Sequence, residues 1–203
     1  MTKRCIWCGS DPLYVDYHDK EWGVPVWDDQ TLFEFLLLEG AQAGLAWITV
    51  LRKREGYRKL FSDFDATKVA GYTDTRLEKI LVNPAIIRNR RKVFGARQNA
   101  RCFLAVQEQY GSFARYIWNF IDGQPIQNRW RSPQEVPANT PVSDMISKDM
   151  KQRGFTFVGS TIVYAHMQAT GMVNDHTTDC FRHLQCETLA AAGEGRACKT
   201  PLI

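Results

Sequence analysis

Residues 31–47, TLFEFLLLEGAQAGLAW, decide the fold. Leu32, Phe35 and Leu36 recur at steps of three and four residues, which places their side chains on one face of a helix. Glu39 continues the same spacing and therefore falls on the face that must be buried against the rest of the protein. The pattern predicts an apolar helix that carries one carboxylate into the interior.

A buried carboxylate at Glu39 is unusual, because a charge without hydrogen-bond donors is costly away from water. Such groups shift their pKa and concentrate in functional pockets. The alternative is a carboxylate at a helix end that escapes to solvent before Gly40 or pairs with an arginine. Tyr17, Trp22 and Trp47 could wall a pocket that sandwiches a flat ring, although each alone is more often a core residue.

The segment GAQAGLAW, residues 40–47, predicts a tight turn between two apolar helices. Gly44 would let the backbone approach a ligand closely. Leu45 could act as an apolar wedge between bases, a device of proteins that unstack DNA. An ordinary helix connection explains the same residues without any ligand.

Helical periodicity extends over most of the chain, whereas strand alternation is scarce. We therefore expect an all-α fold in a single globular domain over residues 1–187, and a poorly ordered tail over residues 188–203. The expected helices, placed from apolar spacing and cap residues, cover residues 31–40, 73–81, 90–110, 113–121, 143–153 and 160–170. Residues 122–141, which contain four prolines, predict an irregular connection with one short turn at 133–136.

The charge of the 203-residue chain is mildly basic, with a net charge of +4. Basic residues cluster at 52–59 and 88–101, where they form either a DNA-binding surface or solvated helix faces. No apolar run is long enough to span a membrane or to act as a secretory signal, so we expect a cytoplasmic protein. Its six cysteines then predict reduced thiols or metal ligands.

Residues that commonly bind metals cluster at the two ends of the chain. His176 and Cys180 are four residues apart and would share one face of a helix or helical turn, while Cys5 and His18 could approach from the N-terminal segment. Two thiolates and two imidazoles form a closed tetrahedral zinc site, which is structural because no position is left for a reactive water. Cys5-x-x-Cys8 and the pair at 183 and 186 have similar spacing, so the ligand set stays open.

Four motifs, three of them long, carry a resemblance that covers nearly the whole globular part of the chain. They are CIW at 5–7, DPLYVDYHDKEWGVPVWDDQTLFEFLLLEGAQAGLAWITVLRKRE at 11–55, NPAIIRNRRK at 83–92 and KQRGFTFVGSTIVYAHMQATGMVNDH at 151–176. In this order they resemble the DNA-3-methyladenine glycosylase I family. The resemblance implies a helix-hairpin-helix glycosylase fold and an enzyme that hydrolyses the N-glycosidic bond of 3-methyladenine in alkylated double-stranded DNA, leaving an abasic site.

The resemblance also implies roles for individual residues. It selects a structural zinc site from Cys5, His18, His176 and Cys180. It assigns Glu39 to the edge of the extruded base and as the catalytic candidate, with Tyr17, Trp22 and Trp47 shaping the pocket. It places DNA contacts at two groups of residues, the turn residues Gln42, Gly44 and Leu45, and the hairpin at residues 84–91 with Arg88, Arg90, Arg91 and Lys92.

Three positions depart from the family pattern. Relatives often have glutamine and serine where this chain has Ala41 and Ala46, and Cys8 is an extra thiol beside an expected ligand.

Two other functions are compatible with the sequence. They are a glycosylase with strand-cleaving activity that uses the Lys92 amine, and a zinc-stabilised DNA-binding module without catalysis. Because one flipped nucleotide needs only one enzyme molecule, and no heptad is present, we expect a monomer.

Overall fold

The computed structural model describes residues 2–192, and most of these are helical. The helices and short 3₁₀ segments, in chain order, are η1 (Ile6–Cys8), α1 (Pro12–Lys20), α2 (Asp29–Gln42), α3 (Trp47–Leu51), α4 (Arg54–Leu60), η2 (Ser62–Phe64), α5 (Ala66–Ala70), α6 (Asp74–Leu81), α7 (Arg90–Tyr110), α8 (Phe113–Asn119), η3 (Pro133–Glu135), α9 (Pro141–Gln152), α10 (Ser160–Ala169) and α11 (Phe181–Ala192). The predicted all-α single domain is confirmed.

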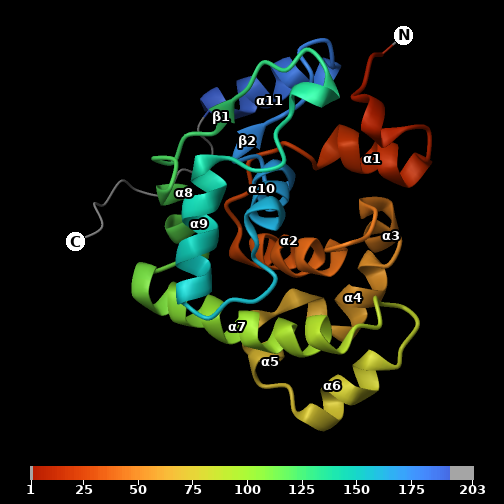
Figure 1. The fold of residues 1–203 in the computed structure, drawn as a ribbon, viewed down its shortest axis with the longest axis vertical. Coiled ribbons are helices and arrows are strands. Elements are labelled where there is room, and N and C mark those ends of the chain that lie inside the picture. The colour runs from red at the N-terminus through yellow and green to blue at the C-terminus, as the bar shows by residue number, and fades with distance from the viewer. Residues whose placement is uncertain (1, 193–203) are drawn as a thin grey trace.

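Helix α2 lies in the middle of the molecule (Figure 1). It packs against α3, α7, α8 and α10, and the carboxylate of Asp28 caps its first turn by accepting from the backbone amide of Thr31. Every residue from Leu32 to Ala41 is buried. The predicted single buried face was therefore too narrow, because α2 is enclosed around its whole circumference.

A second carboxylate on α2, Glu34, shows how a charge is normally accommodated in this core. Its Oε1 accepts from the guanidinium of Arg54 at 2.6 Å and from that of Arg58 at 3.1 Å. Arg54 also donates to Glu21, so the buried charges are paired. Glu39, on the same helix, has no such partner.

Helix boundaries follow local capping chemistry. Thr73 caps α6, Asn89 caps α7, and α7 ends at Gly111, whose φ of 84° is favourable only for glycine. Helix α9 begins two residues earlier than the predicted start at Ser143, because Thr140 forms the cap and Pro141 occupies the first turn. The predicted turn near Pro133 is the 3₁₀ segment η3.

Two short strands, β1 (Ile126–Gln127) and β2 (Val173–Asn174), pair in parallel and were not predicted. Each has two residues, too few for alternation to be visible in the sequence. The pair fixes the start of the segment that continues to His176 and Cys180. It therefore helps to place the C-terminal candidate ligands.

The turn after α10 lies against the segment that follows α1. Gly171 has a φ of +67°, and a Cβ built on it would lie 2.3 Å from the carbonyl carbon of Val24. Backbone hydrogen bonds join Gly23 to Gln168 and Val26 to Thr170, each at 3.0 Å. Because only glycine allows this approach, Gly171 holds the segment that carries Trp22 against α10.

The C-terminal helix α11 continues beyond Glu187 to Ala192. Residues 188–192, which we expected to belong to a poorly ordered tail, are therefore helical, and the rest of that expected tail lies outside the described residues. Within residues 2–192, no helix combines the length and the apolar character needed to cross a membrane.

Candidate active site and metal centre

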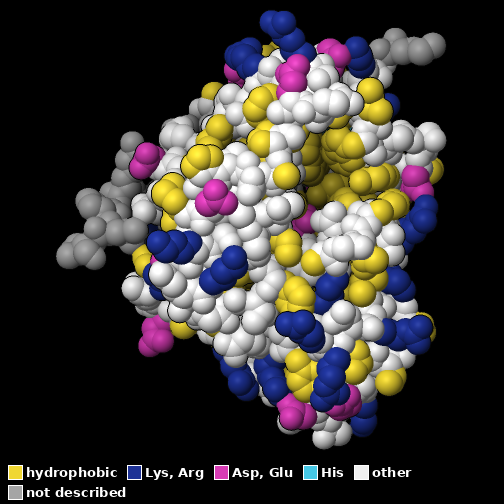
Figure 2. All heavy atoms as spheres, in the orientation of Figure 1, with side chains coloured by type: hydrophobic (Ala, Val, Ile, Leu, Met, Phe, Trp, Pro, Cys, Tyr) yellow, Lys and Arg dark blue, Asp and Glu magenta, His cyan; other side chains and the backbone are white. Residues whose placement is uncertain are grey.

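A cavity of about 360 Å³ opens between α1, α2, α3 and α10. Figure 2 shows it as a hollow with hydrophobic walls. Its lining residues are Cys5, Trp7, Tyr14, Tyr17, Trp22, Glu39, Gln42, Trp47, Pro133, Val136, Ala165, Gln168, Asp175 and Thr177. The cavity therefore contains every predicted base-binding residue, and its volume is in the range of small-molecule sites.

Glu39 reaches this cavity from the C-terminal half of α2. The residue is only 4 % exposed, and burial raises the pKa of its carboxyl group from 4.5 to about 8. No arginine or lysine forms an ion pair with it among the described residues. The alternative interpretation of Glu39, a carboxylate that is solvated or paired with an arginine, is therefore wrong.

Aromatic side chains surround the space above Glu39. The rings of Tyr17 and Trp47 lie 5.5 Å apart, and the ring of Trp7 packs 4.9 Å from Trp22 and 5.0 Å from Tyr14. Trp7 and Tyr14 were not predicted as site residues. The available signals were the position of Trp7 inside the CIW motif and the three-residue step from Tyr14 to Tyr17 on one helix.

Unpartnered polar atoms concentrate in this cavity. Five buried side-chain polar atoms lack a hydrogen-bond partner among the described residues, and three of them belong to cavity residues, namely Trp7 Nε1, Trp47 Nε1 and Glu39 Oε2. Leaving such atoms unpaired costs free energy, and they often mark a place where a ligand supplies the partner. Three residues of the cavity wall therefore hold a polar atom that the protein itself leaves unpaired.

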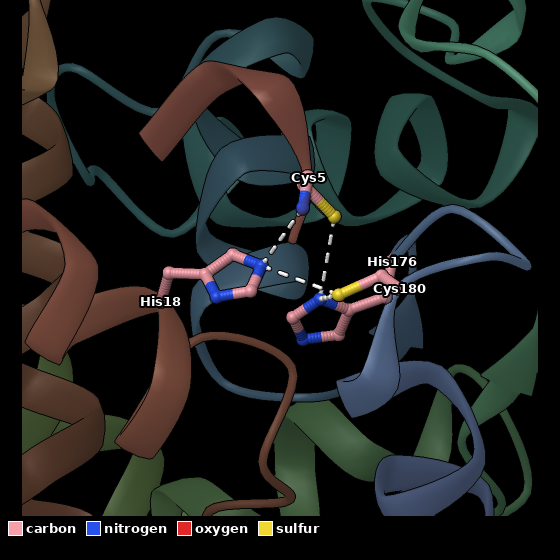
Figure 3. Close-up of side chains that lie close together, drawn as sticks. All are labelled: Cys5, His18, His176 and Cys180. Carbon is pink, nitrogen blue, oxygen red and sulfur yellow. Dashed lines mark hydrogen bonds between the residues drawn. The ribbon is translucent and has the colours of Figure 1, made fainter. Parts of the chain in front are cut away.

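Four buried metal-ligating side chains meet beside the cavity (Figure 3). The ligating atoms of Cys5, His18, His176 and Cys180 all lie within 4.8 Å of one another. Three of the separations, Cys5 Sγ to His176 Nδ1, Cys180 Sγ to His18 Nε2 and Cys180 Sγ to His176 Nδ1, are 3.5 Å. Metal bonds of about 2.0–2.3 Å give tetrahedral ligand separations of about 3.3–3.8 Å, so these residues fit one metal ion.

The second ring nitrogen of each histidine is also positioned. Nδ1 of His18 lies 2.7 Å from a carboxylate oxygen of Asp19, which Arg4 binds in turn, and Nε2 of His176 lies 3.0 Å from the carbonyl oxygen of Trp22. His18 Nε2 and His176 Nδ1, the other ring nitrogens, face the cluster, as expected of metal-ligating histidines. The contact with Trp22 joins the metal centre to the cavity wall.

The other residues with metal-like spacing stand outside this cluster. The thiol of Cys8 donates to the carbonyl oxygen of Cys5 at 3.2 Å, and Nε2 of His183 lies 2.9 Å from the carbonyl oxygen of Asn128. His176 and Cys180 meet through a turn, closed by the bond from the Cys180 amide to the Thr177 carbonyl. The spacing alone could not distinguish these alternatives, because it contains no information on the tertiary contacts.

The turn after α2 occupies the edge of the cavity. Gln42 lines the cavity, Gly44 has a φ of +81° with open space where a Cβ would be, and Leu45 is 40 % exposed. Ala46 is the N-cap of α3 and provides no side-chain hydrogen bond, whereas a serine there could cap the helix. Ala41 is buried, so its contribution to the turn is made by its backbone.

The hairpin between α6 and α7 is held in place by two side chains. Lys53 donates to the carbonyl oxygen of Pro84 at 2.6 Å, and the hydroxyl of Tyr57 accepts from the amide of Ile87 at 3.2 Å. Arg88 and Arg91 are exposed and form no ion pair among the described residues. They are the hairpin arginines left to contact an external anion.

Arg90 and Lys92 have partners inside the protein. Arg90 pairs with Glu78. The ammonium group of Lys92 donates to the carbonyl oxygens of Ala41 at 2.7 Å and Ala43 at 2.8 Å, and desolvation lowers its pKa. Lys92 therefore caps the end of α2 and ties the start of α7 to the turn that carries Leu45.

Much of the remaining basic charge is structural. Arg54 and Arg58 pair with Glu34, Arg97 pairs with Asp74, and Arg101 donates to the carbonyl oxygen of Ala70. Even so, Lys and Arg side chains gather on the lower part of the face that carries the cavity, over α4, α6 and α7 (Figures 1 and 2). The basic clusters thus combine internal pairing with a positive surface.

Comparison with known proteins agrees with this site. The model of the methyladenine glycosylase family matches residues 7–183. The chain belongs to the methyladenine glycosylase family. The DNA-3-methyladenine glycosylase of Haemophilus influenzae is 47 % identical over 180 residues, which cover 89 % of this chain and 97 % of that protein.

Solved structures of this family share the fold. A crystal structure of 3-methyladenine DNA glycosylase I has a TM-score of 0.85 and 51 % identity, with 88 % of this chain and 98 % of that chain covered. A substituted 3-methyladenine DNA glycosylase I in complex with 3-methyladenine also has a TM-score of 0.85, at 33 % identity, covering 88 % of this chain and 96 % of that chain.

The raised pKa of Glu39 predicts a pH-dependent cost to stability. The native state holds a proton on Glu39 up to a pKa of about 8, whereas the unfolded chain releases it near 4.5, so Glu39 makes the free energy of unfolding fall as the pH rises between these values. Glu39→Gln removes this dependence. The free energy of unfolding of the variant minus that of wild type should therefore be larger at pH 8 than at pH 4.5, by on the order of a few kcal/mol. Denaturant unfolding across this range checks it. The exposed Glu108→Gln is the control, and an equal pH profile for Glu39→Gln and wild type would contradict the prediction.

The metal cluster predicts a loss of stability on metal removal. A strong chelator, or Cys180→Ser, should remove one metal ion per chain and lower the thermal midpoint by more than about 10 °C, because the metal joins both ends of the chain. Elemental analysis and thermal unfolding measure both effects. Cys8→Ser, which replaces a buried thiol outside the cluster, should retain the metal. Equal metal content in the Cys180→Ser and Cys8→Ser variants would disprove this ligand set.

Proposed function

We propose that the protein removes 3-methyladenine from double-stranded DNA by receiving the everted base in the cavity above Glu39. The observation that carries this proposal is the buried, unpaired carboxyl group of Glu39 among aromatic rings. A base inside a duplex is inaccessible, so the nucleotide must rotate out, at a cost of a few kcal/mol that is smallest for weakly paired bases. The family's substituted enzyme with bound 3-methyladenine supports the same ligand.

Glu39 can serve the base in both protonation states. With a pKa of about 8, its carboxyl group is largely protonated at neutral pH in the free protein, so one oxygen donates a hydrogen bond and the other accepts. This pair matches the ring nitrogen and exocyclic amine on the edge of adenine. A cationic methylated nucleotide lowers the pKa of Glu39 and favours the carboxylate.

Positive charge distinguishes the damaged nucleotide from normal adenine. Methylation at N3 makes the base cationic, which strengthens its attraction to the faces of Tyr17, Trp22 and Trp47 and to the Glu39 carboxylate. The same charge makes the base a better leaving group. Water can then attack the sugar carbon without a strong general base, and the product is an abasic site.

The position of Lys92 supports simple hydrolysis over strand cleavage. A lyase needs a lysine amine free to attack the sugar carbon. The amine of Lys92 instead donates to two backbone carbonyls at the end of α2. Its role is therefore to support the turn of Gln42, Gly44 and Leu45, from which Leu45 would enter the space that the everted base vacates.

The hairpin and the metal complete the proposed enzyme. Backbone amides of residues 84–91 and the start of α7 would hold a phosphate, assisted by the free guanidinium groups of Arg88 and Arg91 and by Arg90 after exchange from Glu78. The metal held by the two cysteines and two histidines would be zinc, which suits this donor set and closes the site against catalysis. We expect the protein to be cytoplasmic, since free thiols persist in a reducing compartment. We also expect it to be a monomer, since one flipped nucleotide needs only one enzyme molecule.

Release of the base from alkylated DNA tests the function directly. Wild-type protein should release 3-methyladenine, measured by chromatography, and leave an abasic strand that is uncut and gives no borohydride-trapped adduct. Glu39→Gln retains similar shape but loses the charge, so its single-turnover rate should fall by about 10²-fold. Glu108→Gln should act as wild type, whereas an unchanged rate for Glu39→Gln would exclude the role given to Glu39.

The hairpin arginines should affect DNA binding without affecting the cavity. Arg88→Ala and Arg91→Ala should each weaken binding to duplex DNA and reduce the slope of log affinity against log salt by about 1. Binding of free 3-methyladenine should stay unchanged. Arg115→Ala, on α8, is the control, and a salt slope that is unchanged in both hairpin variants would argue against phosphate contact here.

A further inference from the structure

Asp175 and Gln168 line the cavity, and neither has a role in the function proposed above. Asp175 is 3 % exposed and forms no ion pair among the described residues. Oδ1 accepts from Asn128 Nδ2 at 2.7 Å and Trp130 Nε1 at 2.8 Å, while Oδ2 accepts from the Tyr164 hydroxyl at 2.7 Å and Gln168 Nε2 at 2.8 Å. Four donors therefore fix this carboxylate in one orientation.

The carboxylate of Asp175 in turn fixes the side-chain amide of Gln168. All four contacts of the Asp175 carboxyl group come from donors, so the amide nitrogen of Gln168 faces it, and the reversed amide would place two oxygens together. Oε1 of Gln168 has no hydrogen-bond partner among the described residues. The oxygen of Gln168, a residue of the cavity wall, is thus an acceptor that the protein leaves unpaired.

We infer that Gln168 is a specificity-determining residue that accepts a hydrogen bond from the 6-amino group of 3-methyladenine and disfavours purines with a carbonyl oxygen at C6. Adenine carries an N–H donor at this position, and guanine carries an acceptor. Two acceptors that face each other without a proton leave both unpaired. This inference rests on the proposed function, because it requires the base to occupy the cavity.

Asp175 acts through Gln168 as a positioning residue, and Asp175→Asn tests that coupling. The indole N–H of Trp130 can only donate, so it keeps the oxygen of the new asparagine on its own side. The asparagine amide nitrogen then faces Tyr164 and Gln168. The Tyr164 hydroxyl can rotate to accept, and the Gln168 amide must turn over, which presents its N–H₂ group to the cavity.

Binding of free bases to the full-length, metal-loaded protein measures this preference. The probes are 3-methyladenine and 3-methylguanine, and the readout is quenching of tryptophan fluorescence. Gln168→Met removes the hydrogen bond at similar size and should reduce the preference for 3-methyladenine by about tenfold. Asp175→Asn should shift the preference further toward 3-methylguanine than Gln168→Met does. Gln152→Met, on the exposed end of α9, should retain the wild-type preference.

The outcomes separate this inference from the proposed function. If wild-type protein neither binds 3-methyladenine nor releases it from DNA, the proposed function fails. If wild type binds it and Gln168→Met has the wild-type ratio of affinities, only the role of Gln168 is overturned. If Asp175→Asn loses affinity for both bases equally, Asp175 does not orient Gln168. If Asp175→Asn fails to fold, Tyr164→Phe takes its place, since it removes one of the four donors to Asp175. Tyr164→Phe should change the ratio of affinities by less than Gln168→Met does. A larger change would overturn the inference.

Discussion

The proposed recognition of the base depends on the carboxyl group of Glu39, which is buried without a charged partner. Glu34, five residues before Glu39 on the same helix, shows that this core can pair a carboxylate with arginine, yet Glu39 has none. Its burial raises its pKa to about 8, which costs stability at neutral pH. A loss of folding stability of this kind is expected at a binding site, where a cationic ligand supplies the charge that the buried carboxyl group lacks in the free protein.

The cavity around Glu39 is assembled by contacts from both ends of the chain. The cluster of metal-ligating side chains brings Cys5 and His18 together with His176 and Cys180, and Nε2 of His176 lies 3.0 Å from the carbonyl oxygen of Trp22. Gly171 allows the segment after α1 to lie against α10. The side-chain cluster and the cavity therefore share residues, because Cys5 belongs to both and Trp22 contacts His176.

Local patterns in the sequence were enough to predict the helices α2 and α6 to α10, because capping residues such as Thr73 and Asn89 and the glycine at 111 act within a few residues. The helices α1 and α11 were missed. The buried position of Glu39 was also predictable from spacing. Other features depend on contacts between distant segments. They are the choice among metal ligands, the internal pairing of Lys92 and Arg90, the two-residue strands, and the cavity residues Trp7, Tyr14, Gln168 and Asp175. Periodicity carries no information on those contacts, and for the ligands and the hairpin only the family resemblance supplied it.

The most direct measurement is the titration of Glu39 in the free protein by ¹³C NMR of side-chain carboxyl groups, with Glu39→Gln used to assign its signal. A buried, unpaired carboxyl group predicts a titration midpoint near 8 that moves to lower pH when DNA with a cationic methylated base is bound. A midpoint near 4.5 that the DNA leaves unchanged would contradict the account, because Glu39 would then be a solvated carboxylate remote from the base.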